Sequence, residues 1–254
     1  MAQFAFGSGT FWGTPLTDSA GNAITVPTPL RLGAFQDVAI DMSFDVKMLH
    51  GQNNFPLAIG RGKGKIGIKA KFAQVNGAVL NSLFFGQTLA ANGIGAVVDN
   101  TGAVIPSTPF TITPTPPSSG VWSADLGVRS SLGVPLTRVA SAPATGQYSV
   151  AAGVYTFAAA DAALTVYIDY QYTYTSTTAR KSTITNPLIG NLPTLRTDFL
   201  VSYGGKILTM TFNSCTSSKL GFSTKLDDFM IPEIDVEAFA DASGNIGTYS
   251  MSDN

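Results

Sequence analysis

Few residues of this 254-residue chain could support catalysis. His50 is the only histidine, so a Ser-His-Asp triad would depend on it and a histidine-rich metal site is excluded. Cys215, the only cysteine, follows an apolar, threonine-rich stretch, which favours a buried thiol over a nucleophile. Asp227 and Asp228 could form a carboxylate dyad, but adjacent side chains in an extended segment point apart. We therefore predict no catalytic, cofactor-binding or metal-binding residue, and no enzymatic activity.

A second candidate for chemistry is the basic stretch GRGKGKIGIKAKF at 60–72, which holds five Lys or Arg residues and no acid. It is not a phosphate-binding P-loop, because Lys65 stands where the second glycine belongs and Ile66 follows it. Its charged residues instead alternate with glycine and apolar residues, which indicates a β-strand with one solvated face. A grip on nucleic acid is the less favoured alternative.

The run DVAIDMSFDVKM at 37–48 shows the same period of two and predicts a strand of roughly 40 Å. Turn-forming residues separate the two runs, so the sequence predicts one long antiparallel β-hairpin over about 37–70, with its tip near 51–56. His50 then lies at an exposed turn. Strands of this length exceed the usual five or six residues, which suggests that they pair beyond their own domain.

Charges on the two runs suggest a register for this hairpin. If paired positions sum to 106, the pairs are Asp45 with Arg61, Asp41 with Lys65, and Asp37 with Lys69. Each exposed pair would contribute only about 0.2 to 1 kcal/mol.

Residues 226–254 carry seven acids and no Lys or Arg, opposite in sign to residues 61–71. The two regions either neutralise each other within one chain or meet on neighbouring copies, and the sequence leaves both alternatives open. The candidate residues for charge pairs or contacts between subunits are Arg61, Lys63, Lys65, Lys69, Lys71, Asp227, Asp228 and Glu233.

The rest of the chain predicts a mainly β protein, a β-sandwich or barrel with one packed α-helix. The helix is expected at about 72–85, capped by Gly86, from apolar residues at helical spacing, namely Phe72, Val75, Val79, Leu80, Leu83 and Phe84. Five prolines between 106 and 117 exclude a central strand there. We expect one elaborated domain over 1–254, with a Pro-rich loop and a β insertion at about 100–180.

The composition restricts the classes of function. A net charge of −1 argues against a protein that wraps nucleic acid. A charged content of 12% is found in chains that hide surface in an assembly and also in all-β proteins. The start of the chain has no secretory signal pattern, and no apolar run of about 20 residues predicts a membrane helix.

Four blocks in consistent order carry a resemblance to a known family. They read FAFGSGTFWGTPLTDSAGNAI, LGAFQDVAIDMSFDVKMLHGQNNFPLAIGRGKGKIGIKAKFAQVNGAVLNSLFFGQTL, GQYSVAAGVYTFAAADAALTVYIDYQYTY and LTMTFNSCTSSKLGFSTKLDDFMIPEIDVEAFADASGNIG. Together they resemble the major tail tube proteins of tailed bacteriophages over nearly the whole chain.

This resemblance implies a virion structural protein that forms six-fold rings, which stack into a tube for DNA ejection. Its implied partners are other copies of the chain, other tail proteins such as tape measure, tail terminator, baseplate or sheath, and phage DNA that passes without sequence-specific binding. The implied location is the virion tail, assembled in the host bacterial cytoplasm, with no membrane. Asp37, Asp41 and Asp45 are the candidate lumen-facing residues.

Two alternatives stay open. A capsid decoration protein or another head or neck structural protein would also be mainly β and free of catalytic motifs. A receptor- or carbohydrate-binding module would expose aromatic side chains, and Tyr170, Tyr172 and Tyr174 mark the strand on which to look, although packing is the more frequent role of such residues.

Overall fold

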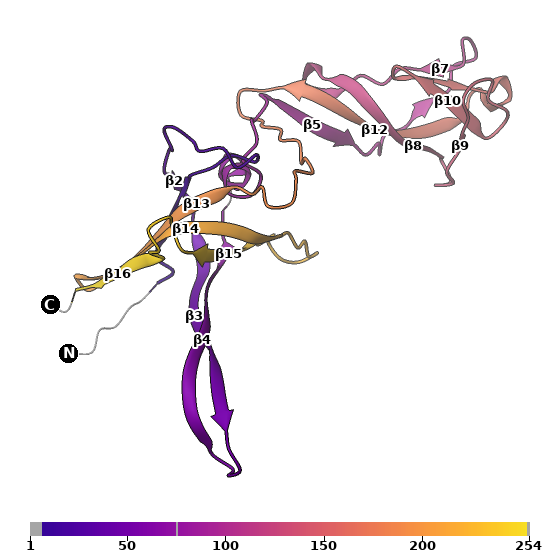
Figure 1. Cartoon of the computed structure of the whole chain (residues 1–254). Helices are drawn as coiled ribbons and strands as arrows, with labels where there is room; N and C mark the ends of the chain where they lie inside the picture. The colour runs from indigo at the N-terminus through magenta and orange to yellow at the C-terminus, as the bar shows by residue number, and fades with distance from the viewer. Residues whose placement is uncertain (1–6, 75, 253–254) are drawn as a thin grey trace. The chain divides into compact units, whose positions relative to one another are not determined.

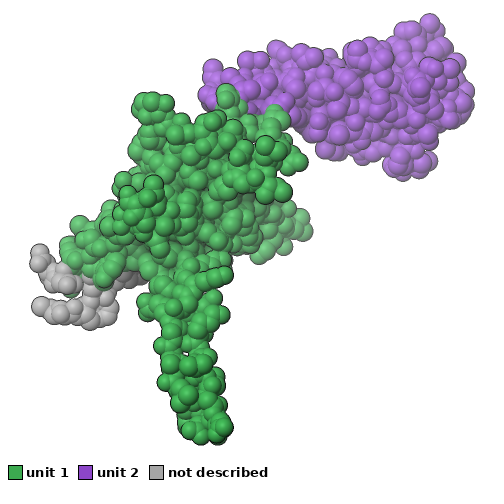
Figure 2. All heavy atoms as spheres, viewed as in Figure 1, with its two compact units in different colours: residues 1–89, 182–254 green, residues 90–181 purple. Residues whose placement is uncertain are grey.

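The computed structural model describes residues 7–74 and 76–252, and they form a mainly β structure, as the sequence predicts. The chain divides into two compact units (Figure 2). Unit 1 comprises residues 1–89 and 182–254, and unit 2 comprises residues 90–181. The insertion expected at about 100–180 lies within unit 2, and each unit has its own hydrophobic core.

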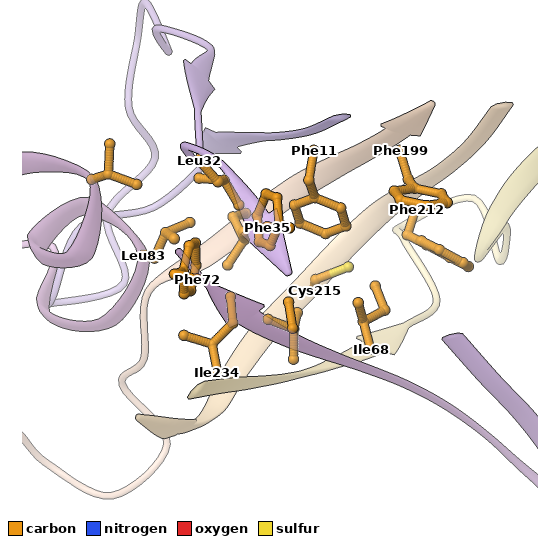
Figure 3. Packing of buried hydrophobic residues seen from close by; sticks show 14 of the residues in the cluster. Phe11, Leu32, Phe35, Ile68, Phe72, Leu83, Phe199, Phe212, Cys215 and Ile234 are labelled. Atoms are coloured by element: carbon orange, nitrogen blue, oxygen red, sulfur yellow. The ribbon is translucent and has the colours of Figure 1, made fainter. Parts of the chain in front are cut away.

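Unit 1 is built on one antiparallel sheet with the strand order β2-β1-β13-β14-β15-β4-β3, and β16 also pairs with β14 (Figure 1). The strands are β1 (Thr10–Pro15), β2 (Leu30–Arg31), β3 (Phe35–His50), β4 (Pro56–Phe72), β13 (Thr194–Tyr203), β14 (Lys206–Gly221), β15 (Glu233–Phe239) and β16 (Gly247–Met251). Its core is aromatic and aliphatic, with the Phe35 ring packed against the rings of Phe11 and Phe72, and with Cys215 and Ile234 in the same cluster (Figure 3).

The predicted helix is shorter than the sequence suggests. It comprises α1 (Gly77–Leu80) and a π-helical turn, η1 (Asn81–Phe85), so the prediction that it begins at residue 72 is wrong. Phe72 belongs to β4, where it pairs with Phe35, and Val75 lies outside the described residues. The helix begins where the Asn76 side chain accepts a hydrogen bond from the Ala78 N–H.

The end of the helix is confirmed. Gly86 closes it in the left-handed conformation, with φ of 54°, and donates its N–H to the Asn81 carbonyl. Val79 and Leu83 on this helix are buried in the core of unit 1.

Unit 2 contains two four-stranded sheets that share one core. One sheet holds β5 (Asn92–Val97), β6 (Ala103–Val104), β8 (Val121–Ser130) and β12 (Thr165–Thr175); the other holds β7 (Thr111–Ile112), β9 (Thr137–Arg138), β10 (Gln147–Ala151) and β11 (Val154–Phe157). Short 3₁₀ turns, η2 (Pro117–Ser119) and η3 (Ala159–Asp161), complete the unit. The strand that the Pro-rich segment contributes, β7, lies at the edge of its sheet, as its prolines predict.

The tyrosines of β12 pack within unit 2. Tyr170 is buried in the core, and the rings of Tyr172 and Tyr174 lie over Gly95 and Gly93 of β5, where any side chain would collide with them. Aromatic rings that cover cross-strand glycines stabilise a sheet, so the packing role accounts for this strand.

Candidate functional site

The residues considered for catalysis belong to three different segments of unit 1. His50 is exposed at the end of β3, and Asp227 and Asp228 are exposed in the loop before β15. Cys215 is fully buried, as predicted, and burial raises the pKa of its thiol to about 11, with Thr197 Oγ1 3.4 Å away. In the described part of the chain, no three His, Cys, Asp or Glu residues are grouped so that they could hold a metal ion.

The long hairpin is the structure's most distinctive surface. β3 has 16 residues and β4 has 17, and the turn between them lies at 51–55, so the predicted hairpin is confirmed. β15 pairs with β4 only over residues 66–71, and beyond that point the ribbon projects from the other strands of unit 1 (Figure 1). Residues 56–65 of β4 and the outer edge of β3 therefore present backbone groups that the described chain leaves unpaired.

The predicted register of the hairpin is wrong by two residues. Paired positions near its base sum to 108 rather than 106, so Asp37 lies opposite Lys71, Asp41 opposite Gly67, and Lys65 opposite Ser43. Asp41 and Lys65 still share a face, because a shift of two residues keeps every side chain on its own side of the sheet. Alternation alone cannot distinguish two registers that differ in this way.

A β-bulge changes the pairing further along the hairpin. Phe44 lies opposite Gly64 but Val46 lies opposite Arg61, so β4 holds one more residue than β3 over this stretch. The predicted pair of Asp45 with Arg61 is consequently wrong. The Arg61 guanidinium lies 4.1 Å from the centroid of the Phe44 ring, on the apolar face.

The bulge also extends the apolar face of the ribbon toward its tip, although Arg61 lies on that face as well. In β4, Ile59 is at an odd position whereas Ile66 and Ile68 are at even positions, and the extra residue returns Ile59 to their face, opposite Met48. Sequence reasoning from 60–72 missed Ile59, and this change of parity is the signal that could have found it.

The apolar face starts in the core and continues into solvent. At the base of the hairpin, Ile68 and Ala70 are buried in unit 1. Further out, the same face carries large side chains that are 50% to 65% exposed, a set that we name the distal apolar face: Met42, Phe44, Val46, Met48 and Ile59. Exposed apolar surface of this extent is typical of a site of protein association.

The opposite face is polar. The lysines of β4 lie between acidic residues of β3 on one side and acidic residues of β15 on the other. Two lysines of β4 form ion pairs with β15, with Lys65 Nζ 2.8 Å from Glu237 and Lys71 Nζ 3.8 Å from Glu233. Lys69 lies opposite Asp235 in the same ladder. For Lys65 and Lys71 the structure shows neutralisation within one chain, through exposed pairs that add little stability.

A further set of charges on the hairpin has no ion pair. Within the described residues, the acids Asp37, Asp41 and Asp45 of β3 and the cation Lys63 of β4 have no opposite charge within 4.0 Å. Asp228 pairs with Lys225 at 3.7 Å in its own loop.

Across residues 7–74 and 76–252, no helix is both long and apolar enough to span a membrane. Comparison of the sequence with protein-family models and with curated proteins finds no match.

Proposed function

We propose that this chain is a virion structural protein that self-assembles into stacked rings, and that these rings form the tail tube of a bacteriophage. The observation that carries the proposal is the hairpin of β3 and β4, whose two backbone edges and distal apolar face lie uncovered in a single copy. An exposed ribbon of this length would aggregate without control unless a specific partner covered it.

A ring of copies covers both edges at once. When copies are related by rotation about an axis along the hairpin, β3 of one copy lies beside β4 of the next, in antiparallel orientation. Repetition of this contact closes a barrel of hairpins in which no edge is left open. A mainly β chain with one short helix on the core of unit 1 is compatible with the β-sandwich and packed helix that the resemblance implies.

The two faces of the hairpin determine which side would line the bore. The apolar face continues the core of unit 1, so it faces protein, and the polar face with Asp37, Asp41 and Asp45 faces the channel. On that face the lysines of β4 alternate with acidic strands on both sides. A bore of this kind lacks the continuous basic surface that would hold duplex DNA by counterion release, so DNA could slide through it.

The test is electron microscopy of negatively stained purified protein, together with a variant whose hairpin is shortened. Met42 and Ile66 are cross-strand partners, so residues 43–65 can be replaced by an Asn-Gly turn. We expect rings or tubes from the native chain and folded monomers from the shortened one. Monodisperse native monomers at high concentration would contradict the proposal, and binding to capsids without tubes would favour a head protein.

A further inference from the structure

We propose that neighbouring copies recognise each other through opposite charges on the two open edges of the hairpin: Asp41 and Asp45 on β3 of one copy, and Lys63 on β4 of the next. This inference rests on the proposed function, because it specifies the contact by which the rings would form.

Asp45 and Lys63 lie at the same height on the two edges of the hairpin. Phe44 pairs with Gly64 and Val46 with Arg61, so Asp45 lies at the level of Gly62 and Lys63. Copies related by rotation alone lie at one height, which brings Asp45 of one copy level with Lys63 of its neighbour. Strands in a closed barrel are staggered, and a shift along β3 would bring Asp41 to the same place.

In the described part of the chain, these residues also have no ion-pair partner. Lys65 and Lys71 are already engaged by Glu237 and Glu233 of their own chain, whereas Lys63 has no acid within 4.0 Å in the described structure. Lys63 shares the polar face with Lys65, two residues away. Gly62 faces Asp45 across the hairpin, and a side chain at Gly62 would contact the Asp45 Cβ, so the glycine leaves space around this carboxylate.

The same charges disfavour other pairings of the hairpin. Pairing of β4 with β4 of a second copy would place Lys63 and Lys65 beside the same lysines of that copy. Like charges across a ladder are destabilising. A two-fold pairing of β3 with β3 could match Asp45 with Lys47, but it would leave residues 56–65 of β4 uncovered. Only the pairing of β3 with β4 covers both edges with a single kind of contact.

A mixing experiment tests the inference. One variant carries Asp41→Lys and Asp45→Lys, and the other carries Lys63→Asp. Alone, each variant opposes like charges at every contact, and we expect the protein concentration needed for assembly to rise at least about tenfold. Mixed in equal amounts, the two variants can alternate around a ring with opposite charges at every contact, and we expect assembly to return.

Lys47→Asp is the matched control. It makes the same charge change on the same hairpin, but Lys47 lies level with Gly60, so the pairing of β3 with β4 would be unaffected. Failure of Lys47→Asp to assemble would instead favour the two-fold pairing of β3 with β3. Thermal unfolding of each variant as a monomer shows whether the fold is intact.

The outcomes separate the inference from the proposed function. If the native chain assembles and both charge variants assemble equally well, or if their mixture is not rescued, the charge recognition is overturned while the tube proposal stands. Rescue by mixing cannot come from a pair inside one hairpin, because each chain still carries its own mismatched charges. If the native chain forms no assembly, both ideas fall together.

Discussion

At the scale of single residues, the Asp125 carboxylate of β8 is a buried charge held by several partners in unit 2. Its side chain is 4% exposed and accepts hydrogen bonds from the Tyr148 hydroxyl at 2.8 Å and the Tyr155 hydroxyl at 3.2 Å. Trp122 Nε1 donates to the Tyr155 hydroxyl, and Arg138 Nε lies 3.7 Å from the carboxylate. A buried charge with several partners of this kind specifies a single arrangement of the side chains around it.

Removal of this carboxylate should destabilise unit 2. Asp125→Ala leaves two buried tyrosine hydroxyls without their acceptor, and we expect a loss of about 3 kcal/mol in the free energy of unfolding. Asp125→Asn, which keeps one acceptor oxygen, should lose less. Urea unfolding followed by near-ultraviolet circular dichroism of the tyrosines measures both variants, and an unchanged midpoint for Asp125→Ala would show that the network contributes nothing.

The same tyrosines should make unit 2 less stable at alkaline pH. Burial, and then the hydrogen bond and negative charge of Asp125, raise the pKa of Tyr148, and burial with Asp125 also raises that of Tyr155. Unfolded tyrosines ionise near pH 10 whereas the folded ones keep their protons, so unfolding becomes more favourable above about pH 10. We expect the urea midpoint of unit 2 to be level between about pH 7 and 9 and to fall above pH 10. A flat profile to higher pH would contradict this account.

At the scale of elements, the bulge in β4 explains how a strand with a change of parity keeps one apolar face. Deletion of a residue within a strand ordinarily turns every later side chain to the other face. Gly62 is one of the two β4 residues that lie opposite Asp45 at the bulge. Its deletion should therefore leave a regular ladder, with Asp45 opposite Lys63 and Val46 opposite Arg61.

Two glycine deletions test this reading of β4. We expect the Gly62 deletion to fold and to assemble like the native chain. Deletion of Gly67, which is paired with both Asp41 and Glu237, shifts a regular ladder and should cost unit 1 several kcal/mol because buried side chains turn outward. Thermal unfolding and electron microscopy report the two effects. Equal damage from both deletions would mean that the bulge itself is required.

At the scale of the whole molecule, the two units are separable in the chain. Ala90 and Lys181, the ends of unit 2, exchange two backbone hydrogen bonds of 3.0 Å, which holds these ends about 5.5 Å apart. Each unit has its own hydrophobic core, and the hairpin belongs to unit 1.

Excision of unit 2 should therefore leave assembly intact. We expect a chain with residues 90–181 replaced by a short Gly-Gly linker to fold and to form the same rings or tubes as the native chain. Residues 90–181 expressed alone should fold as a monomer. Light scattering and electron microscopy measure both, and loss of assembly without loss of folding in the excised chain would assign unit 2 a part in the contacts between copies.

The amino-acid pattern alone was sufficient to predict the local features of the fold. Strict alternation in 37–48 and 60–72 was sufficient for two long strands and for the faces of most side chains, but not for Arg61, which the bulge turns to the apolar face. A glycine after an apolar helical stripe marked the end of the helix at Gly86, and closely spaced prolines confined their segment to an edge strand. These features depend on backbone conformation and on neighbours within a few residues, so the sequence pattern records them directly.

Only the tertiary structure decided which strands lie beside one another and in which register. Lys65 and Lys71 of β4 form ion pairs with Glu237 and Glu233 of β15, more than 160 residues away, rather than with the aspartates of β3. A period of two is unchanged by a shift of two residues, and it carries no information about the identity of a partner strand. Register and partner follow instead from closing the core around Phe35, Phe72 and Ile234, a condition that involves the whole of unit 1 at once.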